Sequence, residues 1–185
     1  PARINDPAFG KIREPVLRFT HWARAFGVEE TRTEDAEILR NTASPSTLNQ
    51  QAYRSPSVFN FYRPGFVAPG TESAAAGLVA PELQITTGSS ITGYANFMEG
   101  FVFRDEEDVN YVADYSEELS LANDPAALVD HLDEILTYGS LRAESRTRII
   151  NAVQGVGGAG EEQRRARAGL AVLMMMNSAD YITQR

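Results

Sequence analysis

The stretch Asp124–Leu136, DPAALVDHLDEIL, decides the fold class. Asp124 is a favoured helix-capping residue, and Pro125 suits the first helical position because its missing N–H is not needed there. Gly139, just beyond the stretch, supplies a stop. The apolar residues recur at the three- and four-residue intervals of one helical face: Leu128, Val129, Leu132, Ile135 and Leu136. The stretch therefore predicts an amphipathic helix that begins at Pro125.

Helical periodicity extends over much of the chain. Apolar spacing and capping residues predict further helices over these ranges: residues 15–26, 34–41, 89–103, 142–154 and 161–176, with a final turn through residue 182. The inner face of the helix over residues 89–103 is predicted to hold Ile91, Tyr94, Ala95, Met98 and Val102. The sequence shows no convincing strand pair and no internal repeat. It predicts an all-α fold, an irregular helical bundle of about six helices in a single domain over residues 1–185.

Residues 43–81 interrupt the helical pattern. Ser-Pro and Pro-Gly pairs recur there, and these pairs favour turns. The segment nevertheless holds five large aromatic side chains: Tyr53, Phe59, Phe61, Tyr62 and Phe66. A disordered linker is poor in such residues. We therefore expect one long, ordered, aromatic and proline-rich loop, with Phe59 and Phe61 inserted into the core and Arg63 paired with a carboxylate.

Composition excludes several classes of function. The chain has 185 residues, a net charge of −8 and no cysteine. The acidic charge disfavours a nucleic-acid partner, and no apolar run reaches the roughly 18 residues that a membrane span needs. The absence of cysteine excludes disulfides and thiol catalysis. Residues 99–134 carry twelve acids against Arg104 alone, whereas residues 135–185 are basic, so the two segments could face each other or different partners.

Three features of the sequence invite comparison with known ligand sites, and for each we favour a structural role. Residues 155–160, GVGGAG, match G-x-G-x-x-G, but a helix rather than a strand precedes them, which favours a helix–helix loop. Residues 105–108, DEED, lack the glycine and glutamate of a calcium hand, which favours a solvated acidic turn. The two histidines, His21 and His131, stand at no metal-binding spacing. The sequence thus predicts neither a metal nor a cofactor.

The most unusual segment supplies the candidate site. Residues 55–65, SPSVFNFYRPG, and the polar residues that follow suggest five candidate binding residues: Asn60, Tyr62, Arg63, Glu82 and Gln84. Arg63 could hold an anion with two hydrogen bonds, and Glu82 could act as an acid or base if buried. The aromatic rings could stack on a sugar or another planar ligand. The residues identify no reaction, and whether the chain is an enzyme stays open.

The same segment makes the sequence resemble a known family. Residues 55–70, SPSVFNFYRPGFVAPG, and 77–98, GLVAPELQITTGSSITGYANFM, resemble the C-terminal part of the DUF1800 family, a bacterial domain of unknown function. Residues 10–26, GKIREPVLRFTHWARAF, and the ending LMMMNSADYITQR are similar as well, although the family often has Pro-Glu where Ala179-Asp180 stands here. The resemblance implies a helical protein that is longer than this chain and exported to the periplasm or cell surface. This chain would be its C-terminal portion.

The resemblance also implies partners, and three functions remain open. Family genes often neighbour genes of a sulfatase-like family, DUF1501, which suggests a shared complex. The preferred function is a non-catalytic helical scaffold or partner-binding portion that contacts the remainder of its own chain or the DUF1501 protein. One alternative is part of an enzyme, such as a hydrolase, whose site is shared with the region N-terminal to this chain. The other is carbohydrate or cell-surface binding through the aromatic loop. Apolar surface left uncovered could be buried in a homodimer.

Overall fold

A computed structural model describes residues 9–30, 41–104 and 111–185. Helices account for 54% of the structure and strands for 3%, which confirms the predicted all-α class. The chain divides into two compact units. Unit 1 comprises residues 1–18, 37–97 and 183–185, and unit 2 comprises residues 19–36 and 98–182. The predicted helix over residues 34–41 lies almost wholly outside the described residues, and the single-domain expectation stays a prediction.

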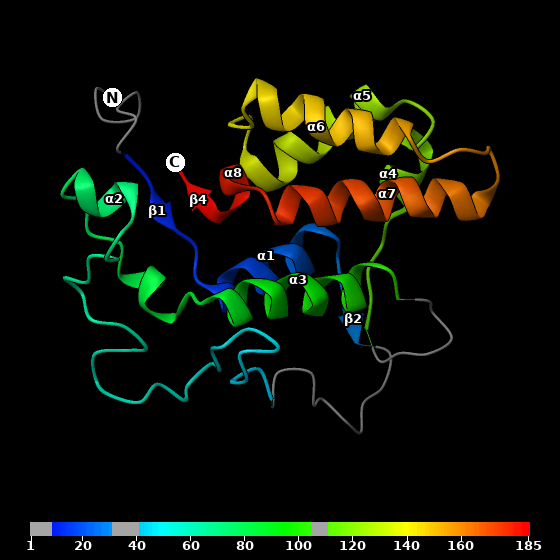
Figure 1. The fold of residues 1–185 in the computed structure, drawn as a ribbon. Coiled ribbons are helices and arrows are strands. Elements are labelled where there is room, and N and C mark those ends of the chain that lie inside the picture. Colours follow the sequence, from blue (N-terminus) through cyan, green and yellow to red (C-terminus); the bar gives the residue numbers. More distant parts are fainter. Residues whose placement is uncertain (1–8, 31–40, 105–110) are drawn as a thin grey trace. The chain divides into compact units, whose positions relative to one another are not determined.

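Unit 1 brings the two ends of the described chain together. Strand β1 (Lys11–Ile12) pairs antiparallel with β4 (Thr183–Gln184), and the two strands lie side by side in Figure 1. This pair corrects the expectation that the chain has no strands. A second two-residue pair, β2 (Glu29–Glu30) with β3 (Tyr111–Val112), lies in unit 2. Two residues are too few to show the alternation by which a strand is recognised in a sequence.

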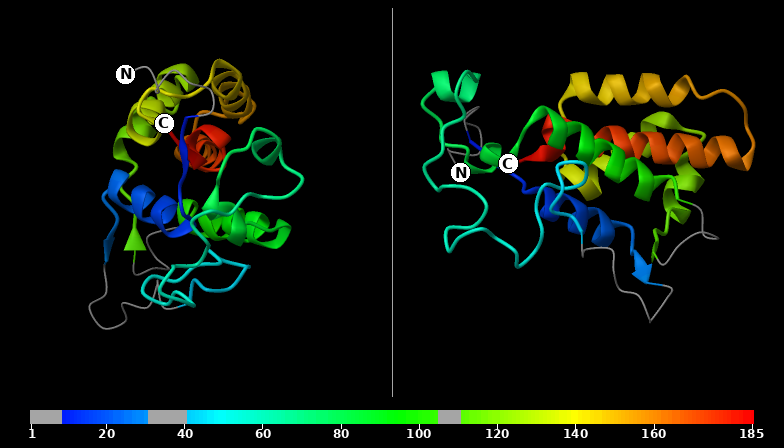
Figure 2. Two further views of the ribbon diagram at one scale, coloured as in Figure 1. Left: turned by 90° about the vertical axis from the view of Figure 1, so that its left-hand side faces the viewer. Right: turned by 60° about the horizontal axis from the view of Figure 1, so that its bottom comes forward.

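The aromatic loop is the largest part of unit 1, and Figure 2 shows its irregular path in cyan and green. Between residues 43 and 81 the one regular element is the four-residue helix α2 (Glu72–Ala75), and the 3-10 helix η1 (Pro81–Ile85) follows. Two long-range hydrogen bonds help to fix the conformation of the loop. The Asn49 side-chain amide donates to the Ile85 carbonyl at 2.8 Å, and the Ala80 N–H donates to the Phe66 carbonyl at 3.0 Å. The predicted long loop is therefore present.

The expected burial of the loop aromatics is partly wrong. Phe59 is 67% exposed, and Tyr53 is fully exposed. The cause is a tight turn in which the Asn60 N–H donates to the Ser57 carbonyl at 3.2 Å and Asn60 adopts a left-handed φ of 71°. Phe59 stands at the corner of that turn, so its ring leaves the loop on the solvent side. Phe61, two residues on, is half-buried.

Helix α3 (Gly88–Val102) confirms the predicted helix but corrects one position of its inner face. Tyr94, Met98 and Val102 are buried as predicted, whereas Ile91 is 60% exposed. Gly93 is buried instead, because the loop backbone crosses it: a Cβ there would lie 2.0 Å from the Pro45 carbonyl oxygen. Only glycine permits such a close approach, so this position cannot be recognised from apolar spacing.

Unit 2 is built mainly from helices of the C-terminal half. These are α4 (Ser116–Leu121), α5 (Pro125–Leu132), the π-helix η3 (Asp133–Thr137), α6 (Ala143–Gln154), α7 (Glu161–Met176) and α8 (Ala179–Ile182). Helices α6 and α7 run side by side in Figure 1, and α5 contacts both. Their apolar faces form a core of fully buried side chains that includes Leu128, Leu132, Leu136, Val153, Val172, Met175 and Met176. Met175 and Met176, at the end of α7, thus fill this core.

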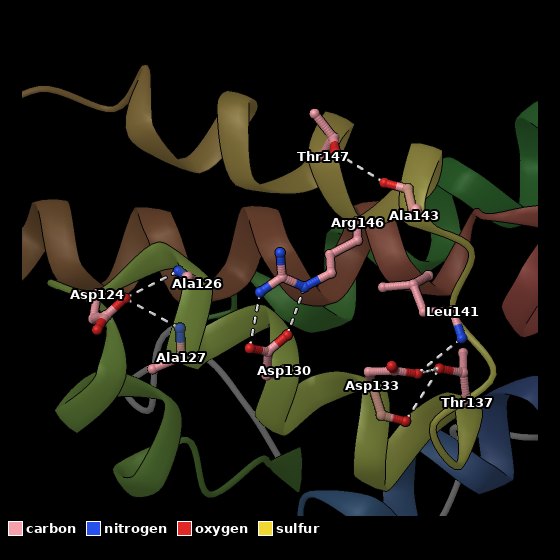
Figure 3. Close-up of polar contacts among 10 residues, drawn as sticks. All are labelled: Asp124, Ala126, Ala127, Asp130, Asp133, Thr137, Leu141, Ala143, Arg146 and Thr147. Carbon is pink, nitrogen blue, oxygen red and sulfur yellow. Dashed lines mark hydrogen bonds and ion pairs between the residues drawn. The ribbon is translucent and has the colours of Figure 1, made fainter.

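The helix start that decides the fold class is observed as predicted. The Asp124 carboxylate accepts hydrogen bonds from the N–H groups of Ala126 and Ala127, both at 3.1 Å, and Figure 3 shows the cap. At the other end, the Asp133 carboxylate accepts from the Thr137 hydroxyl and from the Leu141 N–H. These bonds fix the reversal of the chain that follows η3, which passes through two left-handed residues, Tyr138 at φ 57° and Gly139 at φ 74°.

The acidic and basic segments do face each other at one point. Arg146 donates two hydrogen bonds to the Asp130 carboxylate, at 2.6 and 2.9 Å (Figure 3). The paired guanidinium holds the pKa of Asp130 below its usual range. The predicted acidic turn at residues 105–108 lies outside the described residues.

The glycine-rich segment is a helix–helix loop, as predicted. It connects α6 to α7, and Arg167 of α7 folds back over it. The Arg167 guanidinium donates to the Val156 carbonyl at 2.8 Å and also to the Gly158 carbonyl. Carbonyl groups therefore face the centre of the loop, where a phosphate cradle would present N–H groups. None of the helices in the described ranges has the length and apolarity that a membrane crossing requires.

Trp22 of α1 (Pro15–Ala25) is the centre of an aromatic cluster in unit 2. Its side chain is 1% exposed, and its ring lies 5.6 Å from that of Phe19 and 5.9 Å from that of Phe101. The indole N–H donates to the Tyr115 hydroxyl at 2.9 Å. Burial, more than any other cause, raises the pKa of Tyr115 above its usual range.

This raised pKa predicts a loss of stability in alkali. A tyrosine that titrates higher when folded leaves stability unchanged below its ordinary pKa of about 10 and removes stability as the pH rises beyond it. We expect the urea midpoint to fall between pH 9 and pH 11, and to fall less steeply in Tyr115→Phe. Tyr53→Phe, at a fully exposed ring, should keep the wild-type slope. Equal slopes in Tyr115→Phe and the wild type would contradict the prediction.

Candidate functional site

A pocket of about 690 Å³ lies within unit 1. Three stretches of sequence meet around it: the β1 segment with Lys11 and Glu14, the aromatic loop with η1, and the β4 segment with Thr183 and Arg185. The lining side chains are a mixture of rings, apolar groups and charges, among them Phe9, Phe59, Asn60, Tyr62, Leu78 and Glu82. The volume falls within the roughly 300–1,000 Å³ typical of small-molecule sites.

Glu82 is the most deeply buried charged group in this lining. It lies in η1, which begins with Pro81, and its side chain is 4% exposed. The nearest cation in the described part of the chain is Lys11, whose Nζ lies 3.9 Å from Glu82 Oε1. That separation exceeds the roughly 2.7–2.9 Å of a charge-assisted hydrogen bond. The Lys11 side chain is itself 71% exposed, so the pair is loose.

A second carboxylate, Glu14, is held on another side of the pocket. Gln50, 2% exposed, donates from its amide nitrogen to Glu14, and its amide oxygen accepts from the Val16 N–H at 3.2 Å. Gln50 thus fixes the carboxylate at the beginning of α1. Burial raises the pKa of Tyr62 above its usual range, and its interactions with the Glu14 and Glu82 carboxylates raise it further.

The structure brings together three of the five predicted site residues. Asn60, Tyr62 and Glu82 line the pocket. Arg63 and Gln84 lie outside the lining and contact each other, since the Arg63 N–H donates to Gln84 Oε1 at 2.7 Å. Arg63 is exposed, and within the described ranges its guanidinium forms no ion pair, contrary to the expected carboxylate partner.

Sequence reasoning missed the contribution of Lys11, Glu14 and Gln50. Each is an ordinary polar residue beside an apolar helix or inside the loop, and the contacts that matter span more than thirty residues of sequence. One signal was present: Lys11 is the one lysine of the chain. Composition alone gave no reason to connect it with a site.

The two histidines belong to unit 2 and are not among the lining residues of this pocket. His131 Nε2 lies 2.8 Å from Glu118 Oε1, and its Nδ1 lies 3.6 Å from Glu117 Oε1. The His21 ring is stacked 5.6 Å from Tyr181 and 5.8 Å from Tyr138. His21 is thus engaged in ring packing and His131 in pairing with carboxylates, which agrees with a structural role for both. In the described part of the chain no group of three or more metal-ligating side chains is suited to hold a metal ion.

Unit 2 also contains a cavity of about 820 Å³. Its lining combines apolar residues of α3, α4 and α7 with two cations, Arg104 and Arg165, and two acids, Asp114 and Glu162. The Arg104 guanidinium lies 4.8 Å from the centre of the Phe101 ring. No predicted site residue lies there. The unit 1 pocket is therefore the candidate functional site.

Its chemistry is that of a binding site with fixed acceptors. Glu14 and Glu82 present carboxylate oxygens, Asn60 presents an amide, and Tyr62 presents both a ring and a hydroxyl. Such groups can bind hydroxyls, amines or cations.

Comparison with known proteins identifies the family. The chain has no match among curated proteins or among solved structures. The family described as "Protein of unknown function (DUF1800)" matches residues 2–183, which is nearly the whole chain. The resemblance carried by the aromatic loop is thereby confirmed, and the chain belongs to the DUF1800 family.

Proposed function

We propose that this DUF1800 chain is a non-catalytic binding module, and that a small ligand or a side chain of a partner enters the unit 1 pocket. The observation that carries the proposal is that Asn60, Tyr62 and Glu82, three of the five predicted site residues, line one pocket of about 690 Å³. Buried polar groups in a concave, partly aromatic lining are characteristic of ligand sites.

The pocket favours binding over hydrolysis. The hydrolytic alternative draws on Arg63 to hold an anion beside Glu82, yet Arg63 is exposed and outside the lining. The binding function needs only the groups that line the pocket. Glu14 supports this view, because Gln50 donates a hydrogen bond to it and thereby fixes its position. A fixed acceptor selects ligands by geometry.

Carbohydrate recognition is a second candidate, and Phe59 favours it. This ring lines the pocket and is 67% exposed, beside the Asn60 amide. An exposed ring next to hydrogen-bonding groups can stack on the apolar face of a sugar. Export to the periplasm or cell surface, and partnership with a DUF1501 protein or with the remainder of a longer chain, remain proposals that such a binding module would suit.

A protein-detected NMR screen tests the binding function. Isotope-labelled chain would be titrated with neutral sugars, carboxylates, amines and short peptides. We expect hits that shift the amide signals of residues 10–14, 59–64 and 79–82 together. Val79→Trp places a bulky side chain at a lining position that is 55% exposed, and should weaken binding by about tenfold or more, roughly 1.4 kcal/mol.

Val67→Trp is the matched control, because Val67 is an exposed loop valine outside the lining. It should bind like the wild type. Hits that ignore the pocket, or a screen in which no class of compound shifts its signals, would contradict the proposal. Recovery of a chemically altered ligand would show that the module is catalytic.

A further inference from the structure

We infer that the unit 1 pocket recognises an ammonium group through Glu82, with the Lys11 side chain as a tethered competitor for the same position. The inference rests on the proposed function and names the chemistry of its ligand. An alkylammonium group can belong to a free amine or to a lysine side chain of a partner peptide. Both present the same cation to the pocket.

The Glu82 carboxylate lacks a close partner within the protein. The Glu82 side chain is 4% exposed, and a carboxylate withdrawn from water needs hydrogen-bond donors or a close cation. In the described ranges its one ion-pair partner is Lys11, and no donor is within hydrogen-bond distance of its carboxylate. The carboxylate lines the pocket. A ligand that enters can therefore supply the missing donor.

The charged side chains of the lining differ in how firmly they are held. Four charged side chains contribute: Glu14, Glu82, Lys11 and Arg185. The two cations are exposed and sit on long, flexible stems, so both can turn towards solvent. The two carboxylates are held, Glu82 by burial and Glu14 by Gln50. The fixed charge of the pocket is therefore negative and favours a cation.

The lining also contains aromatic rings that can contact a cation. Phe9, Phe59 and Tyr62 contribute to the pocket beside the carboxylates. Ring faces attract cations, and attraction increases when the cation loses its water. Burial is the main cause of the raised pKa of Tyr62, but the charges of Glu14 and Glu82 add to it, and the same charges would stabilise a cation. An anionic ligand would be repelled by both carboxylates, Glu14 and Glu82.

Lys11 gives the inference its most specific consequence. Its backbone is held in the β1–β4 pair, so its side chain can leave Glu82 without disturbing the strand. A ligand ammonium must replace Lys11 near the carboxylate. Removal of the Lys11 charge should therefore strengthen the binding of amines. If Lys11 only packed against the pocket, its replacement would weaken amine binding or leave it unchanged.

The experiment uses the 185-residue chain and four simple probes. Butylammonium and tetramethylammonium chloride carry the cation, and butanol and sodium butyrate are neutral and anionic controls of similar size. NMR titration at constant ionic strength should show binding of the cations in the pocket and little binding of the controls. Glu82→Gln should lower the affinity for the cations by about tenfold or more, and Lys11→Met should raise that affinity severalfold.

Arg63→Gln is the matched control, since it removes an exposed loop charge outside the lining and should leave affinities unchanged. N-acetyl-lysine methylamide, set against butylammonium, distinguishes the two sources. Tighter binding of the lysine derivative indicates a partner peptide, and weaker binding indicates a free amine; either supports the inference.

Two results would overturn the inference while leaving the binding function intact. One is a neutral sugar that binds in the pocket with equal affinity in Glu82→Gln, with amines inert. The other is amine binding that Lys11→Met fails to strengthen, and this second variant decides the matter even if Glu82→Gln does not fold. If no class of compound shifted the signals of the pocket residues, the proposed function itself would be refuted.

Discussion

Alanine at Gly93 should be among the most destabilising single substitutions in this chain. The added Cβ would lie 2.0 Å from the Pro45 carbonyl oxygen and 2.8 Å from the Ser46 backbone. These are main-chain atoms, so no side-chain rotation can relieve the overlap, and the loop must move away from α3. Overpacking typically costs about 1–3 kcal/mol, and we expect the upper end or more here. Urea denaturation measures the change in the free energy of unfolding.

The same helix provides a control of opposite sign. Gly100 is exposed, and a Cβ there would have no atom within 4 Å. Gly100→Ala should stabilise the chain, because glycine inside a helix costs roughly 0.5–1 kcal/mol relative to alanine. Equal stabilities of the two variants would refute the close approach at Gly93. Since the displaced loop also carries Asn60 and Tyr62, Gly93→Ala should lose pocket binding and Gly100→Ala should keep it.

Truncation of Trp22 to alanine should remove the centre of the unit 2 aromatic cluster. The side chain is 1% exposed and contacts the rings of Phe19 and Phe101. Removal of such a residue typically costs about 3–5 kcal/mol. For a chain of this size each kcal/mol lowers the melting temperature by roughly 2–4 °C, so a fall of about 6–20 °C is expected in thermal unfolding.

Trp22→Phe separates packing from hydrogen bonding. It keeps an aromatic ring but removes the indole N–H that donates to Tyr115. We expect a much smaller loss than in Trp22→Ala. The double variant Trp22→Phe/Tyr115→Phe should recover part of that loss, because it also removes the Tyr115 hydroxyl that Trp22→Phe leaves without its donor. A melting temperature of Trp22→Ala close to that of the wild type would show that the cluster contributes little to stability.

The helices could be predicted because their signals are local. Asp124 and Pro125 start a helix through bonds to their own next residues, and the observed α5 begins there. The glycine-rich loop followed from the helix that precedes it. The failures have non-local causes: Ile91 lost its expected burial because Pro45, from a distant loop, crosses α3 at Gly93. The spacing of apolar residues within 89–103 carries no information about the loop that crosses the helix there.

The candidate site was predicted in part for the same reason. Asn60, Tyr62 and Glu82 stood out because they lie in or beside an unusual aromatic loop. Glu14 and Lys11 come from the N-terminal segment, far from the loop in sequence, and only the folded structure places them at the pocket. Arg63 attracted attention by its chemistry, but the backbone turns it away, with its N–H bound to Gln84.

The pairing of β1 with β4 has a consequence for the order of folding. Lys11 is opposite Gln184, so this pair closes a loop that contains almost the entire chain. Closure of long loops costs entropy and slows folding, whereas residues 98–182 of unit 2 form a nearly continuous segment with local contacts. We expect unit 2 to fold first and the β1–β4 pair to form last. Because residues of both strands line the pocket, ligand binding would then require that folding is complete.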